Sequence, residues 1–169
     1  MDDIEVSIRH AKIQDLEKIG ILIKDAIHNM NQNGILQWDE LYPDQQLIEE
    51  DILNSHMYLG EIENQLVCMF VINQQFDEQY IAGDWKYKES SYMVIHRLCV
   101  NPAYQKHGVG TKTMQIIENM LMNDGIKAIR LDAFSQNPYA LRMYERLGYQ
   151  KTGEANWRKG LFYLYEKLL

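Results

Sequence analysis

Hydrophobic and polar positions along the chain follow two periods, which separate predicted strands from predicted helices. Residues 6–10 alternate between apolar and polar side chains, as in a strand with one buried face. Apolar residues between positions 16 and 30 recur at steps of three and four, which predicts an amphipathic helix that Asn33-Gly34 ends. The same criteria predict further strands at Met57–Ile62, Leu66–Ile72, Tyr92–Val100, Ala128–Phe134, Tyr149–Thr152 and Leu161–Lys167. They predict further helices at Asp44–Asn54, Val109–Asn123 and Pro138–Leu147.

The order of these elements is β-α-α-β-β-β-α-β-α-β-β, which predicts an α/β fold. A short polar link between the strands near residues 60 and 70 favours an antiparallel hairpin. The later strand-helix-strand unit requires a parallel crossover. We therefore expect a mixed, mainly antiparallel sheet flanked by helices. Residues 1–169 contain no repeat or linker and are predicted to form a single domain, with Asn73 to Ser90 as a long exposed connection.

Charge and composition restrict the partners. The chain of 169 residues has a formal net charge of −7, which disfavours binding to nucleic acid. Any anionic ligand must be held by a local site that acts against this charge. The acidic N-terminus lacks a signal region and no apolar run is long enough to span a bilayer, so we expect a cytoplasmic protein with no membrane partner. Cys68 and Cys99 lie in apolar runs and read as reduced, buried thiols, and no spacing suggests a metal site.

A glycine-containing segment between a predicted strand and a predicted helix is the first candidate for chemistry. Its glycines allow tight turns, and the first N–H groups of the following helix form an anion site suited to a pyrophosphate. The alternative is an ordinary loop whose glycines serve packing. The pattern is neither a P-loop nor a dinucleotide fingerprint. The segment consists of Gln105, Lys106, His107, Gly108, Val109, Gly110 and Thr111.

The predicted helix after residue 137 is the second candidate. Asn137 is suited to cap this helix, Pro138 to occupy its first position, and Gly148 to end it. Tyr144 lies two turns after Asn137, on nearly the same face. The two side chains could line a ligand channel, or Asn137 could only cap and Tyr144 only pack.

Together, the two segments resemble the GNAT superfamily of N-acetyltransferases. The run from Leu98 to Pro102, followed by Gln105, Gly108 and Gly110, is similar to the acyl-CoA signature of that family, and Tyr144-x-x-x-Gly148-Tyr149 to its second motif. The resemblance covers residues 93–149 by motif and the whole chain by element order. It implies an enzyme that uses acetyl-CoA as co-substrate, needs no metal, and acetylates a primary amine of a small molecule or peptide by direct attack in a ternary complex.

The resemblance also implies roles for individual residues. Residues expected to bind acetyl-CoA are Leu98, Cys99, Val100, Gln105, Lys106, His107, Gly108, Val109, Gly110, Thr111, Asn137 and Tyr144. In the family the strand that contains Leu98 separates from the next strand, and the gap admits the cofactor. Tyr144 matches the position of the proton donor to the departing thiolate. Trp38 and Tyr42 lie in the segment that often walls the acceptor pocket, although both could simply cover the core.

The general base is left open by the sequence. His96 resembles a catalytic histidine of the arylalkylamine N-acetyltransferases, and its ordinary pKa suits a base near neutrality. It could instead be a structural histidine beside the cofactor strand. Val94 stands where some members have a carboxylate, so that route is absent.

Two other function classes remain at this stage. One is a non-catalytic module that binds or senses acyl-CoA, against which the retained Tyr144 argues. The other is a nucleotide-binding regulatory domain that uses only the glycine segment. The identity of the amine acceptor and the preferred acyl chain are not indicated, and a homodimer is suggested only by its frequency among relatives.

Overall fold

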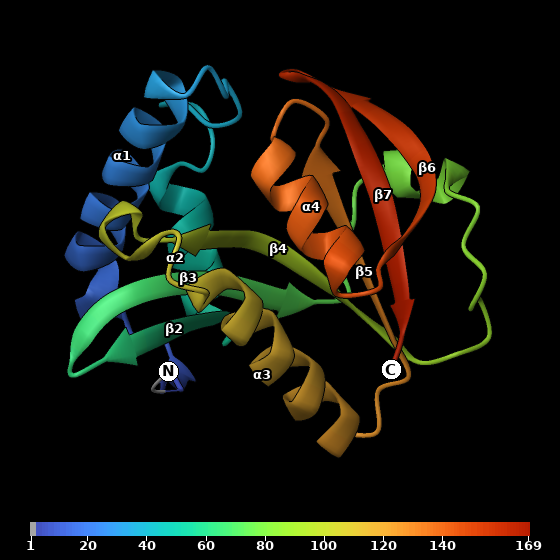
Figure 1. The fold of residues 1–169 in the computed structure, drawn as a ribbon, viewed down its shortest axis with the longest axis horizontal. Coiled ribbons are helices and arrows are strands. Elements are labelled where there is room, and N and C mark those ends of the chain that lie inside the picture. Colours follow the sequence, from blue (N-terminus) through green and yellow to red (C-terminus); the bar gives the residue numbers. More distant parts are fainter. Residues whose placement is uncertain (1–2) are drawn as a thin grey trace. The chain divides into compact units, whose positions relative to one another are not determined.

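The structure is a computed structural model that describes residues 3–169, and it contains seven strands, four α-helices and three short 3-10 helices in this range (Figure 1). The strands are β1 (Ser7–His10), β2 (Met57–Ile62), β3 (Gln65–Asn73), β4 (Tyr92–Val100), β5 (Ala128–Phe134), β6 (Gln150–Trp157) and β7 (Gly160–Leu168). The α-helices are α1 (Leu16–Gln32), α2 (Gln45–Leu53), α3 (Val109–Asn123) and α4 (Pro138–Arg146). The 3-10 helices are η1 (Ile13–Asp15), η2 (Glu78–Ala82) and η3 (Pro102–Tyr104). The predicted order of strands and α-helices is confirmed.

The strands form a mixed sheet in the order β1-β2-β3-β4-β5-β7-β6. The pairs β1–β2, β2–β3, β5–β7 and β6–β7 are antiparallel, whereas β4 and β5 are parallel. The expected hairpin and the expected crossover are therefore both present. The predicted fold class, a mainly antiparallel sheet with flanking helices, is confirmed.

The chain divides into two compact units. The first comprises Met1–Ile72 and Arg97–Met114, and the second comprises Asn73–His96 and Gln115–Leu169. Strand β4 and helix α3 each contribute residues to both units. The expectation of one domain over residues 1–169 stays a prediction.

The core of the first unit forms where α1 and α2 pack on β2 and β3. Helix α1 buries one stripe at steps of three and four, and Asp44 caps the start of α2 by accepting a hydrogen bond from the Leu47 N–H (2.8 Å). Each large aliphatic side chain buried there contributes about 1.5–3 kcal/mol to folding. The core includes Ile19, Leu22, Ile23, Ala26, Trp38, Ile48, Ile52, Met57, Leu59, Met69, Val71 and Cys99. Cys68 and Cys99 are both buried and form no disulfide, as expected.

The second unit is built on β5, β6 and β7, and two aromatic residues of the segment after β3 belong to its core. Tyr80 and Trp85 are only 3% and 6% exposed and pack with Val94, Ala155 and Leu164. The Trp85 indole N–H donates to the Tyr80 carbonyl oxygen (2.7 Å). The segment is otherwise mostly exposed, as expected for a long connection, but these two aromatic residues in it are buried. The polar residues of the segment outnumber its aromatic residues, so the sequence pattern did not indicate burial. Tyr80 and Trp85 nevertheless bury large apolar rings, and this ties the segment to the core.

Strand β6 is longer than predicted. It extends to Trp157 rather than Thr152 and forms a long hairpin with β7 (Figure 1). A register shift lies between Lys151 and Gly153. This bulge and the polar residues around it removed the period of two on which the sequence prediction depended. Among residues 3–169, no helix combines the length and apolar character needed to cross a membrane.

An ion pair in the first unit predicts how stability depends on pH. Arg9 donates two hydrogen bonds to Asp15 (both 2.8 Å), and Asp15 also accepts from the Lys12 N–H (2.7 Å). The hydrogen bond from Arg9 is the main cause that lowers the pKa of Asp15 from 3.8 to about 2. Because the folded pKa lies below the unfolded value, this stabilisation is present above pH 4 and is lost as the pH falls through about 2.

We expect the free energy of unfolding to fall by up to about 2 kcal/mol across this pH range through Asp15, less at high salt. The measurement is urea unfolding at several pH values for the wild type and for Asp15→Asn. The difference between the two proteins isolates this carboxylate from the others. A difference that does not change between pH 5 and pH 2 would contradict the prediction.

Candidate active site

Strand β4 contains an irregularity at its middle. Arg97 has a φ of +50°, in the left-handed region that residues other than glycine rarely adopt. Such a residue bends a strand and redirects the backbone groups around it. The next residues are Leu98, Cys99 and Val100, of which Cys99 is buried and the other two are half-buried. The backbone of β4 therefore departs from regular strand geometry at Arg97, immediately before the residues predicted to contact a cofactor.

The side chain of Arg97 is anchored within the first unit. Its Nε and Nη2 atoms donate to the two carboxylate oxygens of Asp51 on α2 (2.8 and 2.7 Å), and Nη1 donates to the Tyr42 hydroxyl (3.1 Å). The side chains of Arg97 and Asp51 are only 8% and 6% exposed. Burial raises the pKa of Asp51, while the positive charge of Arg97 acts in the opposite direction. A left-handed residue costs about 1–3 kcal/mol, and this buried pair is positioned to offset that strain.

Trp38 and Tyr42 have different surroundings. Trp38 is 7% exposed and belongs to the core of the first unit, whereas Tyr42 is 40% exposed and accepts the hydrogen bond from Arg97. Backbone hydrogen bonds between Asp39 and Tyr42 (3.1 and 3.2 Å) close the turn between them. Because Trp38 is buried, packing in the core is sufficient to explain a large aromatic residue at this position. Tyr42 is the better candidate for contact with an acceptor, and both assignments stay predictions.

The glycine segment leads directly into α3. Lys106 and Gly108 have φ values of +66° and +79°, and α3 begins at Val109, which is 2% exposed. A Cβ atom at Gly108 would meet nothing within 4 Å. The backbone conformation rather than crowding therefore requires glycine at this position. The Gly108 carbonyl accepts from the Lys112 N–H (3.0 Å), which forms the first turn of the helix.

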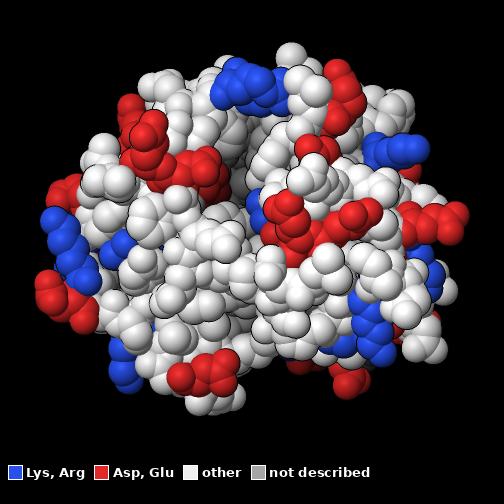
Figure 2. Space-filling model, turned by 180° about the vertical axis from the view of Figure 1, so that it is seen from behind, with Lys and Arg blue, Asp and Glu red and all other residues white. Residues whose placement is uncertain are grey.

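This segment fits an anionic group such as a pyrophosphate. The first N–H groups of a helix have no acceptor within it and carry partial positive charge. Residues 106–108 are exposed, so a ligand can reach the backbone. On the face shown in Figure 2, acidic side chains lie among small, separate groups of Lys and Arg. The backbone N–H groups of the glycine segment itself are therefore the groups suited to hold an anion.

The second unit contributes the other predicted residues. The Asn137 Oδ1 atom accepts from the Ala140 N–H (3.2 Å), so Asn137 caps α4 as expected. Tyr144 is 7% exposed, and its ring lies against Tyr149 and Tyr165, with centroids 5.7 and 6.2 Å away. Burial, followed by the negative charge of Asp132, raises the pKa of Tyr144 above its usual value. Its hydroxyl is therefore protonated near neutral pH, as a proton donor must be.

Two polar contacts of the second unit were not predicted. The Tyr80 hydroxyl donates to Asp132 on β5. The Nε2 atom of His96 lies 2.9 Å from the Oδ1 atom of Asn73, the last residue of β3. The parallel pairs between β4 and β5 are Tyr92–Ala128, Met93–Ile129 and Val94–Arg130. His96 therefore follows the end of that pairing by two residues.

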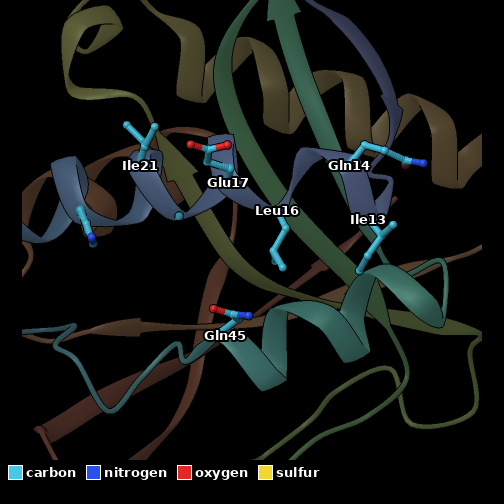
Figure 3. Close-up of a pocket in the computed structure, with 8 residues that line it drawn as sticks. Ile13, Gln14, Leu16, Glu17, Ile21 and Gln45 are labelled. Atoms are coloured by element: carbon cyan, nitrogen blue, oxygen red, sulfur yellow. The ribbon is translucent and has the colours of Figure 1, made fainter.

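An open pocket of about 650 Å³ lies elsewhere in the first unit, between the start of α1 and the start of α2 (Figure 3). It contains none of the residues predicted for the active site. Its lining includes Ile13, Gln14, Leu16, Glu17, Ile21 and Gln45. Among residues 3–169, no three His, Cys, Asp or Glu side chains gather where they could hold a metal ion.

Comparison with known proteins decides the family. Residues 24–149 match the sequence model of the Acetyltransferase (GNAT) family. The chain belongs to the GNAT acetyltransferase family. It is accordingly an acyltransferase, and the predicted enzyme class is confirmed.

Two relatives of this GNAT protein are enzymes of Bacillus subtilis (strain 168). The chain is 26% identical over 163 residues to S-(2-succino)cysteine N-acetyltransferase, covering 94% of this chain and 93% of the relative. It is 24% identical over 152 residues to S-alkylcysteine N-acetyltransferase, covering 88% of this chain and 79% of the relative.

Solved structures share the fold of this GNAT protein. A GNAT-family acetyltransferase from Streptococcus agalactiae superposes with a TM-score of 0.84 at 22% identity, covering 97% of this chain and 95% of the other. The PaiA N-acetyltransferase from Thermoplasma acidophilum, solved in complex with coenzyme A, gives 0.71 at 15% identity and covers 98% of this chain and 99% of the other.

Proposed function

We propose that this protein transfers the acetyl group of acetyl-CoA to the amino group of a small molecule, and that an S-substituted cysteine is the acceptor. The observation that carries the cofactor part is the backbone from Arg97 to Gly108. There, a left-handed residue in β4 and a second left-handed region in the glycine segment precede the N-terminus of α3. Membership of the GNAT family supports the same conclusion.

The residues of the chain suit separate parts of acetyl-CoA. Backbone N–H groups from Lys106 to Thr111 would hold the pyrophosphate, since they lie in an exposed turn at a helix start. The strand residues Leu98 to Val100 would pair with the extended pantetheine arm. Asn137 would add a side-chain hydrogen bond to that arm.

The reaction itself needs three contributions from the protein. Acetyl-CoA supplies a thioester whose carbonyl carbon an amine can attack. A backbone N–H near Leu98 or Cys99 would stabilise the negative charge that develops on the carbonyl oxygen. His96 would accept a proton from the attacking amine, and Tyr144 would donate one to the departing thiolate. Attack by the bound amine requires both substrates to be present together, in a ternary complex.

The acceptor class is supported by the two named relatives, both of which act on cysteine derivatives. Such acceptors carry an α-amine beside a carboxylate. Aromatic rings bind cationic amines through their faces, and Tyr42 is the exposed aromatic residue among the candidates. Tyr42 is also fixed by Arg97, which suits a residue that positions an acceptor.

The test is a thiol-release assay with acetyl-CoA and a series of amines. S-(2-succino)cysteine and S-alkylcysteines are expected to release CoA, and their Nα-acetylated forms are not. Mass spectrometry should find the new acetyl group on the α-nitrogen. Release with polyamines or peptides but not with cysteine derivatives would overturn the acceptor class. Binding of acetyl-CoA without turnover on any amine would favour a non-catalytic module.

Gly108→Ala is expected to raise the Kd for acetyl-CoA about tenfold, equivalent to ~1.4 kcal/mol. A φ of +79°, as at Gly108, is unfavourable for alanine, so the backbone should shift and move the N–H groups proposed to bind the anion. Isothermal titration measures this change. Gly34→Ala is a matched control, because Gly34 has a φ of +72° and is also in open space, but lies after α1. The control should lose a similar amount of stability and keep its affinity; equal affinity losses in both variants would contradict the prediction.

A further inference from the structure

The hydrogen bond between Asn73 and His96 has a direction that a third group determines. Asn73 is 4% exposed, at the end of β3, and its Oδ1 atom lies 2.9 Å from the Nε2 atom of His96. The same Oδ1 atom accepts a hydrogen bond from the backbone N–H of Gln75 (2.9 Å). A backbone N–H can only donate, so the atom that faces it is the amide oxygen. An amide oxygen can only accept, and the Nε2 atom of His96 must therefore carry a hydrogen.

The acceptor atom is held in place independently of His96. The Gln75 N–H bond forms a local turn with the Asn73 side chain, and the Gln74 amide donates to the Tyr92 carbonyl at the start of β4 (3.2 Å). Asn73 is also a strand residue in a buried position. Its oxygen is thus fixed by groups around it and imposes one orientation and one tautomer on the histidine ring.

We propose that Asn73 is a positioning residue that holds neutral His96 as the Nε2–H tautomer and so makes Nδ1 the ring atom that accepts a proton from the amine. This inference rests on the proposed function. The amine nitrogen forms its bond to the acetyl carbon and gives up one proton to Nδ1, the carbon–sulfur bond of the thioester breaks, and the CoA thiolate leaves with a proton from Tyr144, which regains one from solvent. The ring is then an imidazolium with hydrogens on both nitrogens, and Nε2–H keeps its bond to Asn73. The proton passes from Nδ1 to solvent after each turnover, which restores the neutral ring.

Nitrogen-15 NMR of the wild-type protein tests the tautomer without any substrate. The protein is labelled at histidine, and the His96 signals are assigned among the five histidines by their absence in His96→Gln. Above the pKa of the ring, Nε2 should give the signal of a protonated nitrogen and Nδ1 that of an unprotonated one. The reverse assignment would overturn the inference.

Two variants test the positioning role. Asn73→Ala removes the acceptor, and we expect a mixture of tautomers and a kcat at least about tenfold lower, with the KM for acetyl-CoA unchanged. Asn73→Asp keeps an acceptor oxygen, so it should retain the Nε2–H tautomer and a higher kcat than Asn73→Ala. Circular dichroism and urea unfolding identify a variant that does not fold, in which case the wild-type spectrum decides the question. A kcat of folded Asn73→Ala equal to that of the wild type would overturn the positioning role.

The inference and the proposed function can fail separately. If no amine releases CoA from acetyl-CoA with the wild-type protein, the proposed function fails. If CoA is released but Nδ1 carries the hydrogen in neutral His96, the function stands and the role of Asn73 is wrong.

Discussion

Tyr144→Phe is expected to lower kcat by about 100-fold or more, because a general acid typically contributes 10²–10⁴ to the rate. Phenylalanine keeps the ring contacts of Tyr144 with Tyr149 and Tyr165, so the variant loses only the hydroxyl. Because burial raises the pKa of Tyr144, its hydroxyl is protonated near neutral pH and can donate that proton. The Kd for acetyl-CoA should change little. Thiol-release kinetics and isothermal titration measure the two quantities.

Tyr149→Phe is the matched control. The Tyr149 hydroxyl donates to Glu118 (3.0 Å) in a buried position, and Lys167 also contacts the same carboxylate (3.0 Å). The control should therefore lose about 1 kcal/mol of stability, because Glu118 keeps one partner, and should keep its kcat. Similar losses of kcat in the two variants would show that Tyr144 supports the packing of α4 rather than the chemistry.

The elements that the sequence predicted closely are those whose signals are local. Strands β4 and β5 and helix α3 have the expected bounds, since apolar runs, Asn101-Pro102 and Gly125 mark their ends in neighbouring residues. Asn137 caps α4 as its position before Pro138 indicated. In contrast, the length of β6 depends on its pairing with β7 over residues 150–157, and no local sequence pattern predicts that pairing.

The unpredicted parts of the candidate site depend on contacts between residues far apart in the chain. Arg97 is left-handed in a strand, and its partner Asp51 lies 46 residues earlier. Asn73 is 23 residues from His96, and Tyr80 is 52 residues from Asp132. Nothing in the identity of these residues indicates the partner, because Asp, Asn and Tyr are also common on exposed surfaces. The one available signal was a charged or polar residue inside an otherwise apolar strand, as at Arg97 and Asp132.

Arg97→Ala is expected to lower the free energy of unfolding by about 3–5 kcal/mol, the usual effect of removing one partner of a buried ion pair. The variant leaves the carboxylate of Asp51, 6% exposed, without the guanidinium that holds both of its oxygens. Urea unfolding monitored by circular dichroism measures the loss. A change below about 1 kcal/mol, typical of an exposed pair, would contradict the burial of this pair.

The double variant Arg97→Met with Asp51→Leu separates stability from function. Apolar replacement of both partners is often neutral for stability, so most of the lost free energy should return. The backbone conformation of β4 is not expected to recover, because a methionine at position 97 has no partner to offset the strain of a φ near +50°. Position 97 is then expected to relax toward a regular strand, and this would reorient the N–H groups of Leu98 and Cys99, which we propose bind the carbonyl oxygen. We therefore expect kcat to stay at least about tenfold below the wild type although stability recovers. Full recovery of kcat would show that the pair serves folding alone.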